Sequence, residues 1–169
     1  MASRIPTSFL YRSPHKPHGF SLIELMVVLA IMSTLALLAY PSLTLKAQRQ
    51  KEQGLRLALL EIRQGLDAYK KAADAGSVRA SPNGYPEQLK DLVLGMSDLK
   101  SPSEKKIYFL RRIPRDPFYQ GAAETPPENT WGLRAYDSPP DRPSAGRDVY
   151  DVFSLSTETG LNGIPYQAW

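Results

Sequence analysis

The pattern of apolar and polar positions divides the chain into an apolar run, an amphipathic run and a region of short elements. The apolar run, residues 20–40, contains one charged side chain, that of Glu24. A helix rises about 1.5 Å per residue, so a run of this length matches the hydrocarbon thickness of a bilayer. We therefore predict a transmembrane helix over residues 20–41, in which Pro41 removes one backbone hydrogen bond and kinks or weakens the helix.

The helical pattern continues over residues 42–76 but becomes amphipathic. Apolar side chains recur at steps of three and four residues, at Leu55, Leu59, Ile62, Leu66, Tyr69 and Ala73. This spacing puts them on one face of a helix. Charged side chains are expected elsewhere on the helix surface, at Arg49, Lys51, Glu52, Arg56, Arg63 and Lys70. We expect the stripe to pack against the C-terminal body, with contacts between subunits as the alternative, and Gly76 to end the helix near Ala75.

Residues 77–169 differ in character, because proline and glycine separate short elements. We predict a short helix from Glu87 to Leu94, ended by Gly95. Strands or extended segments are predicted in three places, residues 105–114, 130–137 and 148–156, with a loop between the last two. The expected fold is therefore α+β, a long N-terminal helix packed by a small antiparallel β-sheet.

The distribution of charge bears on orientation and on partners. Arg4, Arg12 and Lys16, with no acidic residue among positions 1–19, supply +3 of the net charge of +4. Basic residues ahead of an apolar helix put the N-terminus in the cytoplasm and the C-terminal body outside it. The remaining chain is nearly neutral and has no run of Lys or Arg, so we expect no binding to nucleic acid.

The available residue types limit the chemistry of the chain. It has no cysteine, and its two histidines, His15 and His18, both precede Gly19. Disulfides, cysteine-ligated metals and, in a product that starts at Phe20, a histidine base are therefore excluded. The sequence also lacks a serine-nucleophile elbow, a phosphate-binding lysine loop and a His-Glu-x-x-His helix. We predict that the chain is not an enzyme, and we expect no catalytic residue, metal or other cofactor.

Glu24 stands out, because a carboxylate inside an apolar helix costs about 2.5–3.5 kcal/mol on insertion scales. One interpretation is that Glu24 lies at the membrane interface and reaches water. The surrounding string HGFSLIELMVVLAIMSTLALLAYPSL offers another, since it resembles the N-terminal signature of type IV pilins and type II secretion pseudopilins. Gly19, Phe20 and Glu24 match that prepilin signature position by position, and Pro41 falls where many members have a proline.

The resemblance implies a processing pathway. A membrane-embedded prepilin peptidase would cut between Gly19 and Phe20 on the cytoplasmic side and methylate the new amine of Phe20. Residues 1–19 would be a leader that is removed, while the apolar helix is retained. Because residues four apart share a helix face, this amine could neutralise Glu24 and fix the register of assembly, within one chain or between neighbours.

The body resembles the major pseudopilin of type II secretion systems in patches. These are GYPEQLKDLV, IPRDPF and DVYDVFSLSTETG, although the family often has Asp-Pro-Trp-Gly where this chain has Asp116-Pro117-Phe118-Tyr119. The resemblance implies a calcium site in the C-terminal loop, but Glu158 stands at the matching place and no aspartate follows it. Calcium takes roughly six to eight oxygen ligands, so one carboxylate gives this site little support, and calcium stays only what the resemblance implies. We expect Asp148 and Asp151 to be solvated carboxylates.

These observations predict a structural subunit of a type II secretion pseudopilus, a filament that supports protein export. Its expected parts are a leader (1–19), a transmembrane and filament-core helix (20–41), an amphipathic continuation (42–76) and a small periplasmic α+β region (77–169). We expect a single-pass protein of the bacterial inner membrane, with its N-terminus in the cytoplasm, that joins the pseudopilus on assembly. Expected partners are further copies of the chain, minor pseudopilins, the inner-membrane assembly platform and prepilin peptidase. Two alternatives are a minor type IV pilin for adhesion, motility or DNA uptake, and a signal-anchored periplasmic enzyme or binding protein.

Overall fold

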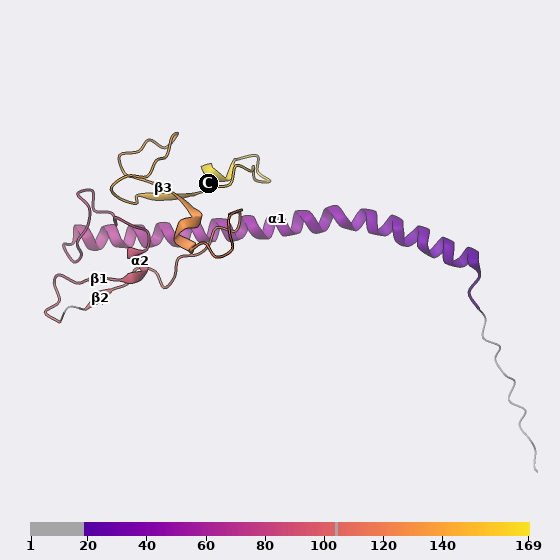
Figure 1. The fold of residues 1–169 in the computed structure, drawn as a ribbon, viewed down its shortest axis with the longest axis horizontal. Helices are drawn as coiled ribbons and strands as arrows, with labels where there is room; N and C mark the ends of the chain where they lie inside the picture. Colours follow the sequence, from indigo (N-terminus) through magenta and orange to yellow (C-terminus); the bar gives the residue numbers. More distant parts are fainter. Residues whose placement is uncertain (1–18, 104) are drawn as a thin grey trace, which may run out of the picture. The chain divides into compact units, whose positions relative to one another are not determined.

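The computed structural model describes residues 19–103 and 105–169, with the side chains of residues 37–43 outside the description. The chain forms two compact units that divide between Leu43 and Thr44. Helix α1 (Leu22–Asp74) supplies the first unit and the opening stretch of the second (Figure 1). The predicted leader lies outside the described residues except for Gly19.

The first unit consists of the apolar start of α1, whose described side chains are all exposed. Ser33 and Thr34 donate hydroxyl hydrogens to the carbonyl oxygens of Leu29 and Ala30, at 2.7 and 2.8 Å. Both polar side chains are therefore satisfied within the helix. Among the described residues, no helical stretch is both long and apolar enough to cross a membrane.

Two predictions fall partly or wholly on residues 37–43. The transmembrane segment predicted over residues 20–41 extends into this stretch, and the kink predicted at Pro41 lies within it. The backbone of α1 continues through Pro41 as helix. Because the side chains there lie outside the description, the transmembrane segment and the kink stay predictions.

The end of α1 agrees with the sequence pattern. The helix ends at Asp74, and Gly76 adopts a left-handed conformation with φ of +71°. The N–H of Gly76 donates to the Ala73 carbonyl and the N–H of Ser77 to the Ala72 carbonyl, both at 2.8 Å. These two bonds form a Schellman motif, which satisfies the last carbonyl groups of the helix and favours glycine.

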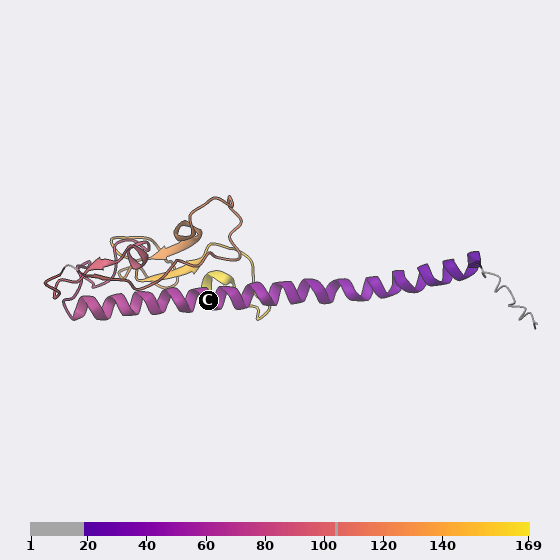
Figure 2. The same ribbon diagram turned by 90° about the horizontal axis from the view of Figure 1, so that it is seen from below.

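The amphipathic stripe of α1 forms one wall of the core of the second unit. Its first five residues, Leu55, Leu59, Ile62, Leu66 and Tyr69, are buried, and Ala73 is partly buried against them. The facing residues include Val78, Leu89, Leu92, Leu110, Ile113, Trp131, Val149 and Val152. Figure 2 shows the short elements of this unit along one side of the helix. The prediction that the stripe packs against the C-terminal body is confirmed.

Helix α2 (Asp91–Leu94) is shorter than the helix predicted to begin at Glu87. Ahead of it, the N–H of Asp91 donates to the Gln88 carbonyl at 3.0 Å, a hydrogen bond over three residues that is typical of a turn. The Asp91 carboxylate in return accepts the N–H of Gln88 at 2.9 Å. Turns stabilised by this side chain replace the first predicted helical turn. Gly95 ends α2 as predicted, with φ of +76°.

The strands are short and paired antiparallel. Strand β1 (Met96–Ser97) pairs with β2 (Lys106–Ile107), and β3 (Trp131–Arg134) pairs with β4 (Asp151–Ser154). Strands β2, β3 and β4 fall within the predicted segments, whereas β1 does not. The described residues thus hold two separate two-stranded sheets instead of one. A long N-terminal helix with small antiparallel sheets agrees with the predicted α+β class.

Close packing between β3 and β4 depends on a glycine. In their register Gly132 lies opposite Phe153. A Cβ added at Gly132 would come within 2.4 Å of the Phe153 ring. The missing side chain therefore lets the aromatic ring cover the neighbouring strand. Two 3-10 turns, η1 (Pro127–Thr130) and η2 (Tyr166–Ala168), complete the second unit.

Candidate functional site

The predicted cleavage site lies immediately before α1. Gly19, Phe20 and Ser21 are outside the helix, which begins at Leu22. The Phe20 residue is 85% exposed, and a Cβ added at Gly19 would meet no heavy atom within 4 Å. The bond between Gly19 and Phe20 is thus accessible without unwinding helix. Nothing in the described fold requires glycine at position 19.

Glu24 lies in the first turn of α1. A carboxylate there interacts favourably with the positive end of the helix dipole, and Ser21 stands three residues before it, which is the spacing of a capping box. The N–H of Leu25 donates to the Ser21 carbonyl at 3.1 Å and so begins the helical pattern. Within the described residues, the exposed Glu24 carboxylate makes no hydrogen bond or ion pair. The carboxylate thus lies exposed at the start of α1.

The first turns of α1 present large apolar side chains around the whole helix. Their exposed fractions run from 44% at Val28 to 77% at Leu22. A contiguous apolar surface of this kind marks contact with protein or lipid. The roles predicted for Gly19, Phe20 and Glu24 stay predictions, and the structure adds that all three lie at an accessible helix start.

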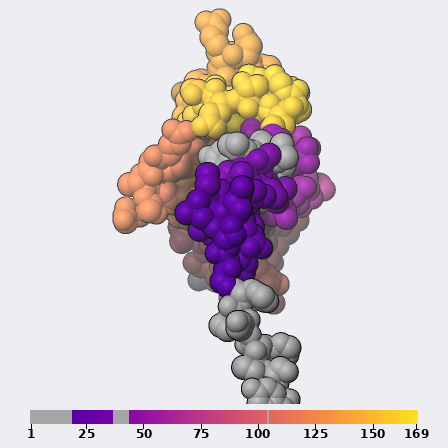
Figure 3. Space-filling model, turned by 90° about the vertical axis from the view of Figure 1, so that its right-hand side faces the viewer, coloured from indigo at the N-terminus to yellow at the C-terminus, as the bar shows by residue number. Residues whose placement is uncertain are grey.

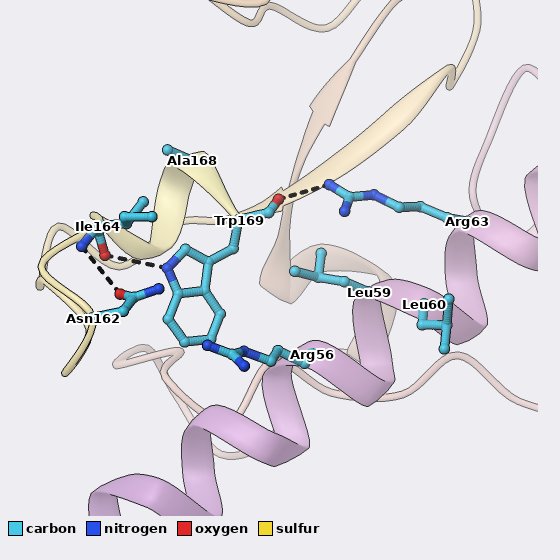
Figure 4. A pocket seen from close by; sticks show the side chains of 8 residues that line it. All are labelled: Arg56, Leu59, Leu60, Arg63, Asn162, Ile164, Ala168 and Trp169. Atoms are coloured by element: carbon cyan, nitrogen blue, oxygen red, sulfur yellow. Dashed lines mark hydrogen bonds between the residues drawn. The ribbon is translucent and has the colours of Figure 1, made fainter.

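A second candidate site is a groove of about 440 Å³ between α1 and residues 158–169. We call residues 158–169 the tail loop; it lies at the surface of the second unit (yellow, Figure 3). The groove is lined by Arg56, Leu59, Leu60 and Arg63 of α1 and by Asn162, Ile164, Ala168 and Trp169 of the tail loop (Figure 4). The side chains of these lining residues carry no carboxylate, hydroxyl, thiol or imidazole. None of these side chains is of a type that usually serves as a nucleophile or general base.

Two arginines of α1 hold Trp169 in this groove. The Arg56 guanidinium lies 4.5 Å from the centroid of the indole ring, which is a cation–π contact. Arg63 donates from Nη2 to the Trp169 carbonyl oxygen at 2.8 Å (Figure 4). It also donates from Nε to the Asp151 carboxylate, at 2.8 Å. Arg63 thereby joins α1 to both β4 and the tail loop.

Asp148 is buried, so the prediction of a solvated carboxylate is wrong for this residue. It is 3% exposed and accepts hydrogen bonds from Asn83 Nδ2 at 2.8 Å and from the Tyr136 N–H at 2.9 Å. Asp151 is only partly buried, but its ion pair with Arg63 also contradicts a purely solvated role. Both carboxylates join segments that are distant in sequence, so no local pattern identifies them.

Glu52 lies on the core face of α1, and the prediction that it belongs to the polar surface is wrong. It is 7% exposed and stands three residues before Leu55, the first residue of the stripe. Its Oε1 accepts hydrogen bonds from the N–H of Leu161 at 2.7 Å and from the hydroxyl of Tyr166 at 3.0 Å. Burial raises the pKa of the Tyr166 hydroxyl, which keeps it a donor. The step of three to Leu55 is the signal that could have identified Glu52.

Metal ligands do not gather in the described structure. Within residues 19–103 and 105–169, the His, Cys, Asp and Glu side chains form no group of three that could hold a metal ion. Glu158, which stands where the resemblance implies a calcium ligand, is exposed. Its Oε1 accepts a hydrogen bond from Gln120 Nε2 at 2.9 Å. The buried carboxylates of Asp148 and Glu52 are likewise held by N–H or O–H donors.

Comparisons with known proteins bear on both units. Residues 14–40 match the family model described as the prokaryotic N-terminal methylation motif. Two curated proteins, each called type II secretion system core protein G, are also similar to the chain. The one from Klebsiella michiganensis is 29% identical over 104 residues, and the one from Pectobacterium carotovorum subsp. carotovorum is 27% identical over 111 residues.

These alignments cover part of each protein. They include 59% and 63% of this chain, and 67% and 65% of the Klebsiella and Pectobacterium proteins, respectively. The chain thus spans about two thirds of the length of these relatives. No solved structure matches the chain significantly.

Proposed function

We propose that this pseudopilin-like chain, which carries the N-terminal methylation motif, is a structural subunit of a type II secretion pseudopilus. In this proposal the subunit is not an enzyme. One observation carries the proposal. The motif spans residues 14–40, so the bond between Gly19 and Phe20 falls just outside α1 and Glu24 falls in its first turn. The names of the two relatives support secretion over the alternative of a minor type IV pilin.

The first step of this function is processing of the precursor. A prepilin peptidase cuts between Gly19 and Phe20 on the cytoplasmic side of the inner membrane, and the new amine of Phe20 is methylated. The exposure of Phe20 supports this step, because the Gly19–Phe20 bond can enter the active site of a protease while α1 stays folded. A Cβ at position 19 would meet no other atom, so the described fold does not need glycine there. A requirement of the peptidase for glycine would explain the residue instead.

The second step is assembly of the processed chain. The positively charged amine of Phe20 on one subunit neutralises Glu24 on its neighbour, and the apolar helix starts pack together in the filament core. An unpaired carboxylate in such an apolar core would be costly, whereas a paired one fixes the stagger between subunits. The lack of any partner for Glu24 within the described chain supports a contact supplied by another molecule.

The proposed location follows from the charge and apolar patterns. The helix start anchors the chain in the inner membrane, with its N-terminus in the cytoplasm and residues 77–169 in the periplasm, until an assembly platform adds it to the filament. Minor pseudopilins share that filament. Three basic residues ahead of the apolar run, and the exposed apolar surface of α1, support this arrangement.

Intact mass and N-terminal sequencing of the protein purified from membranes test the proposal. The mature chain should begin at a methylated Phe20. A chain with Gly19→Leu should retain residues 1–19 and stay out of filaments, because a bulky side chain blocks the approach of the peptidase to the backbone. Wild-type protein that begins at Met1 or near Ser42 would refute the proposal, as would normal processing of Gly19→Leu.

A further inference from the structure

The tail loop (residues 158–169) folds back on itself. The N–H of Gly160 donates to the Ile164 carbonyl at 3.0 Å, and the N–H of Tyr166 donates to the Glu158 carbonyl at 3.1 Å. The indole N–H of Trp169 also donates to the Ile164 carbonyl, at 3.2 Å. These bonds close the loop locally, but they do not attach it to the rest of the unit.

Glu52 attaches the first half of the loop to α1. The same carboxylate oxygen accepts the N–H of Leu161 and the hydroxyl of Tyr166, at 2.7 and 3.0 Å. Hydrogen bonds to an ionised acceptor are stronger than neutral ones, and a buried acceptor left without donors is costly. Gln48, one turn earlier on α1, donates to the same Tyr166 hydroxyl at 3.3 Å.

Aromatic packing and two arginines attach the second half. The Tyr166 ring is fully buried and stacks on Phe118 with ring centroids 4.0 Å apart. The rings of Trp169 and Tyr166 pack edge to face, with centroids 5.1 Å apart. Arg56 stacks on the Trp169 ring and Arg63 donates to the Trp169 carbonyl oxygen (Figure 4). Both halves of the tail loop are therefore fastened to one helix, α1.

The resemblance to major pseudopilins implies that calcium would hold this loop, but the oxygen atoms present do not fit that ion. Glu158 is the single acidic residue among positions 158–169. Its Oε1 accepts from Gln120, and Asn162 Oδ1 accepts the N–H of Ile164 at 3.1 Å. The Glu52 oxygen faces two donors, whose positive ends would repel a cation. Calcium takes roughly six to eight oxygen ligands, several of them carboxylates.

We propose that Glu52, Arg56 and Arg63 of α1 fasten the tail loop in the place where related proteins would use a divalent cation, so that the loop folds without calcium. Residues of one helix, already ordered by the core, supply both an anionic and a cationic anchor. The loop then contributes to the stability of the second unit at any calcium concentration. The contacts that carry this inference do not depend on the proposed function, whereas the comparison with calcium rests on the resemblance to pseudopilins.

Thermal unfolding of the full chain in detergent, followed by tryptophan fluorescence, tests the metal part of the inference, whether or not residues 1–19 have been removed. Trp131 is buried in the core and Trp169 lies in the tail loop, so the signal reports both. The Tm should be the same in excess calcium and in excess EDTA. A ligand that binds only the folded state raises the Tm, so a calcium-dependent rise of several degrees would overturn the inference.

A matched pair of variants tests the side-chain part. Glu52→Ala should lower the Tm by roughly 5–10 °C and expose the tail loop to proteolysis. Glu61→Ala, on an exposed glutamate of the same helix, should leave both unchanged. Tyr166→Phe removes only the hydroxyl and should give a smaller drop, which keeps the test valid if Glu52→Ala does not fold. Equal Tm values for Glu52→Ala and Glu61→Ala, or an unchanged Tm for Tyr166→Phe, would refute the role of Glu52.

Discussion

Arg63 of α1 and Asp151 of β4 form a two-point ion pair between residues that are 88 positions apart in the sequence. Nε lies 2.8 Å from Oδ1, and Nη2 lies 3.4 Å from Oδ2. The side chains are 39% and 25% exposed, so water and salt screen the attraction. Because Arg63 also donates to the Trp169 carbonyl at 2.8 Å, it joins a helix, a strand and the tail loop at one point.

Replacing Arg63 with alanine should lower the free energy of unfolding by roughly 1–3 kcal/mol, since it removes hydrogen bonds as well as charge. Arg63→Lys should recover little of this loss, because an ammonium group cannot reproduce the planar fork. A double-mutant cycle with Asp151→Asn, measured by urea unfolding, should give a coupling of about 0.5–1 kcal/mol that shrinks in high salt. A coupling of zero would show that the ion pair adds no stability.

Ile62 and Leu57 lie five residues apart on α1 in opposite environments, at 0% and 66% exposed. Ile62→Ala should cost about 2–5 kcal/mol, because it leaves a cavity in the core. Leu57→Ala should change the free energy of unfolding by no more than about 0.5 kcal/mol. Urea unfolding of both variants in the full chain measures the difference. Equal losses would contradict the assignment of the stripe to the core.

Tyr69 makes the second unit sensitive to alkaline pH. Burial, with smaller effects from Asp91 and Glu87, raises its pKa from the usual 10.0 to about 12. The stabilisation by the protonated phenol is therefore complete below about pH 10 and is lost as the pH rises towards 12. The free energy of unfolding should fall across this window. Tyr69→Phe, which cannot ionise, should show a shallower fall, and identical slopes for the two proteins would contradict the shifted pKa.

Much of α1 could be predicted because its determinants are local. The steps of three and four from Leu55 to Tyr69 define a buried face, and Gly76 supplies the left-handed residue that ends the helix. Strands β3 and β4 were also predictable, since their segments contain β-branched and aromatic residues and a proline- and glycine-containing loop separates them. These elements follow from rules that act over a few residues, which is why the α+β class could be predicted.

The contacts made by buried carboxylates could not be predicted in the same way. Glu52 binds Leu161 and Tyr166, which are 109 and 114 residues away, and Asp148 binds Asn83, which is 65 residues away. Charge alone suggests an exposed position for such residues, and only the tertiary fold brings their donors close. At the helix start, by contrast, the candidate residues lie next to one another in the chain, so their spacing carries the information.

The carboxylate of Glu24 has two possible tasks that substitutions can separate. In the first turn of α1 its negative charge interacts favourably with the positive end of the helix dipole, and Glu24 lies three residues after Ser21, the spacing of a capping box. In the proposed filament it neutralises the amine of Phe20 on a neighbour. Glutamine at this position keeps the length and the acceptor oxygen that a capping box needs but removes the charge, whereas alanine removes both.

If assembly depends on the charge, Glu24→Gln and Glu24→Ala should both yield mature protein with a methylated Phe20 and few or no filaments, because the amine meets no counter-charge in an apolar core. Intact mass measures processing, and electron microscopy of sheared filaments measures assembly. Processing is the internal control, since the Gly19–Phe20 bond lies outside the helix. Normal assembly of Glu24→Gln with failure of Glu24→Ala would assign Glu24 to the helix end instead, and normal assembly of both would refute the charge pair.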